Sequence, residues 1–257
     1  MMDRPIWGRI SLFYLVAFAL SGLFFGIQEF FGVPGWLQLP NYGPALSALL
    51  FLRLEKQNIP RFLRGSFAFR IDGPTLALLC VPVVIAVSVS WLTSVLWGLA
   101  NLRNPEPGIS PIVMIVAAVV GIIGEEVGWR GYLLPRLQER FNPFVSSMIL
   151  VILWGVWHVP KLLMGFPVFA LWFVSMIGMN LLHTWVYNRT APSLWPVILL
   201  HAAINLTAAF LLASFFEPSV LALYAGACLF AGLALVVLDR KAFFAGPARK
   251  DHVPASI

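Results

Sequence analysis

Charged residues are scarce in this sequence, since Asp, Glu, Lys and Arg together make up 11% of its 257 residues. Soluble domains carry about 25% charged residues, so the composition excludes an ordinary soluble globular protein. Hydrophobic residues account for 60% of the chain, and apolar runs recur along its whole length. We therefore predict a single integral membrane domain over residues 1–257.

Cysteine is nearly absent as well. The two cysteines, Cys80 and Cys228, both lie inside apolar segments. Isolated thiols without a CxxC spacing predict neither a disulfide framework nor a cysteine-based zinc cluster.

Apolar windows of about 20 residues are long enough to cross a hydrocarbon core of ~30 Å. They predict an all-α fold, a polytopic transmembrane helix bundle of about eight spans. The spans are expected near residues 10–31, 41–54, 74–99, 111–127, 145–165, 167–188, 192–214 and 219–238.

Basic residues are distributed unevenly over the loops between these spans. On this map, 15 of the 17 basic residues share the side of the amino terminus, and Arg103 and Lys161 lie on the other side. The positive-inside rule then predicts that both termini are cytoplasmic. Membrane topology also explains the net charge of +6. The expected partner is therefore a lipid bilayer, and we do not expect nucleic-acid binding. The compact chain without targeting signals favours a multi-pass protein of a prokaryotic cell membrane.

Polar and ionisable residues inside the predicted spans cluster in the second half of the chain. An ionised group in hydrocarbon costs about 2.5–3.5 kcal/mol, so such residues usually face a bundle interior and pair with one another. Because several spans contribute them, we predict one shared polar chamber. Its candidate residues are Glu125, Glu126, His158, Asn180, His183, His201 and Asn205.

The stretch GIIGEEVGWRGYLLPR, residues 121–136, places two adjacent glutamates at the end of a predicted span. Glu126 and Arg130 are four residues apart, which suits a salt bridge along one helical face. Glu125 points about 100° away and has no local cation. We therefore predict that Glu126 and Arg130 form a supporting pair and that Glu125 activates water as a general base. Alternatively, the pair marks the membrane boundary, with Glu125 reaching water.

The segment 128–141 alternates apolar and basic residues, and we expect it to leave the span as an interfacial helix. At 1.5 Å per residue, Glu125 would then lie roughly 9 Å from the cytoplasmic edge. His158 and Asn205 would lie roughly 20 Å deep by the same rise. We expect the site to open toward the cytoplasm.

Two short stretches supply the candidate partners of Glu125. HAAIN, residues 201–205, places His201 and Asn205 on one helical face, where both can donate hydrogen bonds to an oxyanion. Hydrogen bonding to a neighbouring helix is the structural alternative. His158 ends the stretch WGVWH, where packing is the alternative to catalysis. We assign His183, which lies near Asn180, to an interhelical hydrogen bond outside the site.

Three motifs in this order resemble the CPBP family of intramembrane proteases, which includes CAAX proteases and bacteriocin-processing enzymes. EEVGWRGYLL matches the EExxxR motif, WGVWH is similar to FxxxH, and HAAIN is similar to HxxxN. The resemblance covers residues 111–206, which we take as the catalytic core. Trp154 replaces the more usual Phe of the second motif. We expect this larger ring, together with Trp129, to line the substrate pocket and to alter its width.

The resemblance implies an intramembrane glutamic endopeptidase that needs no metal and no other cofactor. The matching positions are Glu125 and His158 for the activation of water, His201 and Asn205 for the oxyanion, and Glu126 and Arg130 for the supporting pair. The implied partner is a peptide or protein substrate. Eukaryotic members trim prenylated CAAX proteins, whereas prokaryotic members include bacteriocin-processing, immunity and regulatory peptidases.

Three alternatives remain open at the level of the sequence. Glu125, His158 and His201 could ligate zinc, because two histidines, a glutamate and water form a known catalytic set. Against this, the chain lacks the HExxH pairing. The protein could instead be a non-enzymatic membrane scaffold or immunity protein that binds a peptide. It could also be a proton-coupled transporter, although we find no inverted repeat.

Overall fold

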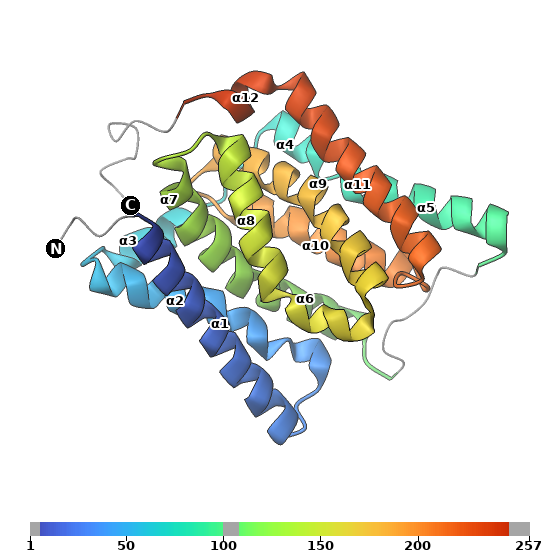
Figure 1. The fold of residues 1–257 in the computed structure, drawn as a ribbon, viewed down its shortest axis with the longest axis horizontal. Helices are drawn as coiled ribbons and strands as arrows, with labels where there is room; N and C mark the ends of the chain where they lie inside the picture. The colour runs from blue at the N-terminus through green and yellow to red at the C-terminus, as the bar shows by residue number, and fades with distance from the viewer. Residues whose placement is uncertain (1–5, 100–107, 247–257) are drawn as a thin grey trace.

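The computed structural model describes residues 6–99 and 108–246, and within these ranges every regular element is a helix. Figure 1 shows a bundle of long helices, with the shorter helices at its ends. The α-helices are α1 (Ile6–Phe30), α2 (Tyr42–Leu54), α3 (Ile59–Ser66), α4 (Gly73–Leu78), α5 (Val81–Trp97), α6 (Pro111–Glu126), α7 (Leu134–Gln138), α8 (Pro143–Trp157), α9 (Phe166–Thr190), α10 (Trp195–Leu211), α11 (Pro218–Leu238) and α12 (Arg240–Phe244). The predicted all-α class is confirmed.

Five helices are long and apolar enough to cross a membrane: Trp7–Phe30, Gly73–Trp97, Pro111–Gln138, Phe166–Thr190 and Pro218–Leu238. Two shorter apolar helices, α8 and α10, and the 13-residue α2 occupy the remaining predicted spans. Each of the eight apolar segments is therefore helical, whereas the span count and the orientation of the termini stay predictions. Arg103, which entered the charge count, lies outside the described residues.

Helices α9 and α11 pack closely because glycine occupies the contact on both sides. A Cβ added at Gly232 of α11 would lie 2.6 Å from the Cα of Gly178 on α9. Small residues at such a crossing let two backbones approach and gain van der Waals contact, which drives helix association in lipid. This contact fixes α9, the helix that carries Asn180 and His183.

Helix α2 packs closely against both α1 and the helix that follows α6. A Cβ added at Gly43 would lie 2.7 Å from the Ala17 carbonyl oxygen, and one added at Gly128 would lie 2.6 Å from the backbone of Pro44. The Ser47 hydroxyl donates to the Phe13 carbonyl at 2.9 Å. Such contacts place α2 against α1 and against the segment that directly follows the two glutamates.

The chain does not leave the bundle after Glu126, so the predicted interfacial helix over 128–141 is wrong. A π-helical segment, η3 (Val127–Leu133), continues α6 directly into α7, and every residue of η3 is buried. The alternation of basic and apolar residues had predicted a helix at the membrane interface. Arg130 is instead neutralised by Glu126 inside the bundle. Glu125 therefore lies near the middle of one 28-residue helical stretch, Pro111–Gln138. π-Helical turns are rare and frequently occur at functional sites.

We predict that Gly232→Ala destabilises the protein, because the new methyl group would overlap the α9 backbone at Gly178. Overpacking of this kind costs about 1–3 kcal/mol. Thermal unfolding of the detergent-solubilised protein measures the loss. Gly226→Ala is the matched control on the same helix, because a Cβ there meets nothing within 4 Å. Equal stability of the two variants would contradict the close crossing.

Candidate active site

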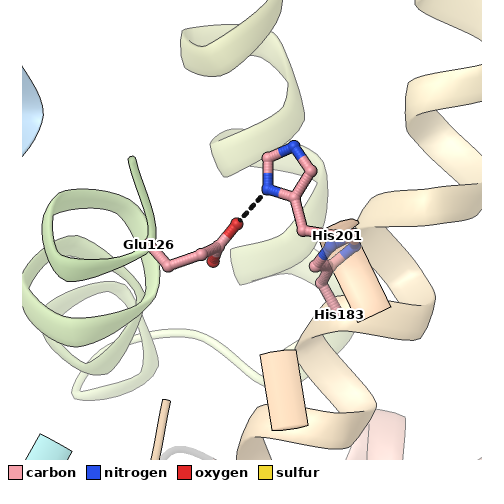
Figure 2. A group of neighbouring side chains, drawn as sticks. All are labelled: Glu126, His183 and His201. Atoms are coloured by element: carbon pink, nitrogen blue, oxygen red, sulfur yellow. Dashed lines mark hydrogen bonds and ion pairs between the residues drawn. The ribbon is translucent and has the colours of Figure 1, made fainter. Parts of the chain in front are cut away.

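Glu126 lies at the end of α6, is 0% exposed and is held by two side chains. Its Oε1 accepts a hydrogen bond from the Arg130 guanidinium at 3.0 Å and another from Nδ1 of His201 at 2.7 Å. The predicted salt bridge between Glu126 and Arg130 is therefore present. Figure 2 shows the bond from His201 of α10 to Glu126.

Arg130 connects this carboxylate to two further helices. Its second amino group donates to Oδ1 of Asn180 at 2.7 Å, and its guanidinium lies 4.4 Å from the centroid of the Trp154 ring. The Asn180 amide in turn donates to the Ser147 carbonyl of α8 at 2.6 Å. Burial of the arginine is thus offset by an ion pair, a hydrogen bond and an aromatic face.

Glu125 has a different environment from its neighbour. It is 3% exposed, and its Oε2 accepts a hydrogen bond from Nε1 of Trp154 on α8 at 2.8 Å. Within residues 6–99 and 108–246, no Lys, Arg or His forms a salt bridge with Glu125. Its burial rules out the alternative in which Glu125 reaches bulk water at the membrane edge.

In each of three histidines, Nδ1 contacts an oxygen atom. Nδ1 of His158 contacts the Trp154 carbonyl at 2.9 Å, and Nδ1 of His183 contacts the Met179 carbonyl at 2.6 Å. Nδ1 of His201 contacts the Glu126 carboxylate. Carbonyl and carboxylate oxygens accept hydrogen bonds, so we assign the proton to Nδ1 in each ring. Nε2 is then the atom available for other chemistry.

One cavity of about 600 Å³ brings the predicted residues together. Glu125, His158, His201 and Asn205 all line it, as does Trp154. Asn205 is exposed to this space and makes no side-chain hydrogen bond to the described residues. The predicted shared chamber therefore exists, and α6, α8 and α10 supply these five residues.

His183 also lines the cavity, so its assignment to an interhelical hydrogen bond outside the site is wrong. Its Nδ1 bonds to Met179 of its own helix, and its ring centroid lies 5.4 Å from that of His201. His183 lies three residues after Asn180, so both residues are on the same face of α9. Asn180 bonds to Arg130, and this shared face could have indicated that His183 also lies near the site. The sequence alone did not show which helix this face of α9 meets.

Trp129 does not line the cavity, which corrects its assignment to the substrate pocket. The side chain is 0% exposed, and its ring lies 6.1 Å from Phe13 and 5.9 Å from Trp157, centroid to centroid. Trp129 follows Glu125 by four residues, but the π-helical turn begins between them. The ring consequently turns into the core.

The cavity extends away from the helix ends where the described chain begins and ends, and the expected opening of the site toward the cytoplasm stays a prediction. The lining includes Phe25 near the end of α1, Asn41 before α2, Lys161 after α8 and Phe216 after α10. These positions lie at the helix ends opposite to those where α1 begins and α11 ends. The predicted depth of Glu125 was measured from a span ending at residue 127, whereas the helix continues to Gln138.

A metal-ligand arrangement exists, although its residues differ from the predicted zinc set of Glu125, His158 and His201. Glu126, His183 and His201 each offer a ligand atom, and these atoms lie within 4.8 Å of one another (Figure 2). Oε2 of Glu126 and Nε2 of His183 are buried without a hydrogen-bond partner. Arg130 already neutralises Glu126 and opposes a second cation there.

We predict that Arg130→Met is strongly destabilising, because it leaves the Glu126 carboxylate buried beside a neutral side chain. Loss of one partner of a buried pair costs about 3–5 kcal/mol. Unfolding in mixed detergent measures this loss, and adding Glu126→Gln to Arg130→Met should recover part of it.

Arg189→Met is the matched control for this prediction. Arg189 pairs with Asp72 at a position where both side chains are more than a third exposed. Hydrogen bonds from Thr75 and Arg189 lower the pKa of Asp72 to about 2. Exposed pairs contribute about 0–1 kcal/mol, so this variant should unfold almost as the wild type does. A larger loss for Arg189→Met than for Arg130→Met would contradict the role given to the buried pair.

Comparison with known proteins places this site in a family. Residues 107–207 match the family model described as Rce1-like, Type II CAAX prenyl endopeptidase Rce1-like. A curated relative, CAAX prenyl protease 2 of Methanococcus maripaludis, is 30% identical over 135 residues, and the match covers 47% of this chain and 47% of the relative. The chain thus matches about half the length of that relative. These two matches support the family predicted from the motifs: residues 107–207, which contain all three motifs, are similar to CAAX proteases.

Proposed function

We propose that this chain is an intramembrane endopeptidase in which Glu125 activates a water molecule against a peptide carbonyl. One observation carries the proposal: Glu125 of α6, His158 at the end of α8, and His201 and Asn205 of α10 line one cavity. A candidate base, a helper and two hydrogen-bond donors around a single space form the set that acyl transfer to water requires. A scaffold protein would not require all of them in one cavity.

Water is deprotonated by Glu125 with the help of His158. Trp154 occupies Oε2 of Glu125, which leaves Oε1 to accept the proton of the water. His158 donates Nδ1–H to the Trp154 carbonyl, so its Nε2 lone pair can orient the same water. The water oxygen bonds to the carbonyl carbon, and its proton passes to Glu125. When the carbon–nitrogen bond breaks, Glu125 delivers this proton to the departing amine, and a carboxylic acid and an amine result.

The carbonyl oxygen gains negative charge during this attack, and His201 and Asn205 stabilise it. Asn205 offers its amide N–H groups directly. His201, whose Nδ1 contacts Glu126, donates from Nε2 when both of its ring nitrogens carry a proton. Arg130 holds the Glu126 carboxylate in place. Glu126 and Arg130 thereby act on the reaction through His201.

The substrate is a peptide or protein at the membrane. The archaeal relative is named CAAX prenyl protease 2, and we extend that substrate class to this chain. The cavity wall is largely apolar, with Phe25, Trp172, Met176 and Phe216 among its members, and a prenyl chain fits such a wall. We place the protein in a prokaryotic cell membrane, which agrees with an archaeal relative.

The direct test compares Glu125→Gln with wild type on a prenylated CAAX-type peptide in detergent. General-base catalysis contributes about 10²–10⁴-fold, so cleavage should fall by that factor while expression and unfolding temperature are retained. Glu139→Gln, which changes an exposed glutamate outside the cavity, is the matched control. Full activity of Glu125→Gln would overturn the proposal. The same comparison in cells separates enzyme from scaffold, because a scaffold phenotype would survive Glu125→Gln.

The zinc-dependent alternative is tested in the same assay with a strong chelator. Loss of activity on chelation, restored by added zinc, would favour Glu126, His183 and His201 as ligands. The proposal expects unchanged cleavage, since every step uses side chains and water.

We further predict that Trp154→Phe lowers kcat, because phenylalanine cannot donate to Glu125. A hydrogen bond to a charged group contributes about 1.5–3 kcal/mol, which corresponds to a loss of roughly 10–100-fold. Trp185→Phe is the control, because it removes an indole bond to the Asp239 carboxylate outside the cavity. Equal kcat for Trp154→Phe and Trp185→Phe would show that the indole does not position Glu125.

A further inference from the structure

Lys161 is the single Lys or Arg among the described residues that line the cavity. It lies in η4 (Val159–Met164), the short 3-10 segment between α8 and α9, three residues after His158. In the charge count it was also one of two basic residues on the sparsely charged side of the predicted membrane. The positive-inside rule therefore does not explain why a lysine occupies this position.

The ammonium group of Lys161 has aromatic neighbours, and it has no salt-bridge partner among the described residues. Its nitrogen lies 5.3 Å from the centroid of the Trp172 ring and 5.5 Å from that of Phe216. No described carboxylate forms a salt bridge with it. An ammonium withdrawn from water is costly unless an anion pairs with it. A ligand that enters the cavity therefore meets the positive charge of Lys161, which has no salt bridge to a described residue.

Among the described residues on the cavity wall, Glu125 is the single Asp or Glu and Lys161 the single Lys or Arg. Glu125 and Lys161 both line this one space. Extended peptide advances about 3.3–3.6 Å per residue, and a volume of about 600 Å³ holds a few residues. A peptide whose terminal carboxylate meets Lys161 therefore presents a carbonyl only a few residues upstream to Glu125.

We propose that Lys161 binds the free C-terminal carboxylate of the peptide substrate and so sets how far from the chain end the cleaved bond lies. This inference rests on the proposed peptidase function. Trp172 and Phe216 hold the ammonium by cation–π contact, and they leave its N–H groups directed at the cavity. A peptide amide at the chain end offers no negative charge and is bound more weakly. Lys161 is a specificity-determining residue in this scheme.

The binding test uses the Glu125→Gln protein, so that turnover does not interfere. Two fluorescent, prenylated CAAX-type peptides of identical sequence, one ending in a carboxylate and one in an amide, are titrated into it. The carboxylate peptide should bind at least tenfold more tightly, as expected for a charge-assisted hydrogen bond. Adding Lys161→Met should remove this preference, whereas adding Lys161→Arg should retain it. Lys241→Met, at an exposed position in α12, is the matched control.

Cleavage by the otherwise wild-type enzyme gives the second measurement. Lys161→Met should lower kcat/KM for the carboxylate peptide at least tenfold and leave the amide peptide within twofold. Equal binding of the two peptides would overturn the inference, whether or not they are cleaved. An equal loss on both peptides would also overturn it, because Lys161 would then serve Glu125 or a lipid headgroup. Absence of cleavage with intact carboxylate preference would instead contradict the peptidase function alone.

Discussion

The shared hydrogen bonding of the Glu126 carboxylate by Arg130 and His201 is the interaction on which the rest of the site depends. All three side chains are buried in an apolar bundle, where an unpaired charge would be costly. Arg130 extends the pairing to Asn180 of α9, and His201 extends it to α10. The pair therefore joins separate helices at one point. Neutralising Glu126 in this way leaves Glu125, one residue earlier, free of any salt bridge.

Close backbone packing makes this polar cluster possible. Glycines at the α9–α11 crossing and along the α2 contact bring the helices near enough for short side-chain bonds. The continuous stretch from α6 through η3 to α7 keeps both glutamates deep in the bundle. Trp154 then fills the centre, since its ring carries Arg130 on one face and its Nε1 reaches Glu125. The larger ring at this motif position adds a hydrogen bond that phenylalanine cannot form.

Local spacing predicted the parts of the site that one helix determines. The salt bridge of Glu126 with Arg130 followed from four-residue spacing, and the apolar runs located the helices. Local spacing could not predict the contacts between helices, because the partners are far apart in the sequence. Trp154 is 29 residues from Glu125, and Asn180 is 50 residues from Arg130. The continuation past Glu126 was missed because Arg130 read as an interfacial charge until its buried partners were known.

The most direct test of the account is an experimental structure of Glu125→Gln protein with an uncleaved prenylated peptide bound. The account predicts one peptide carbonyl oxygen within hydrogen-bond distance of Nε2 of His201 and the Asn205 amide. It also predicts a water between residue 125 and His158 that faces the same carbonyl carbon. A peptide bound outside the cavity, or a carbonyl beyond the reach of both donors, would contradict it.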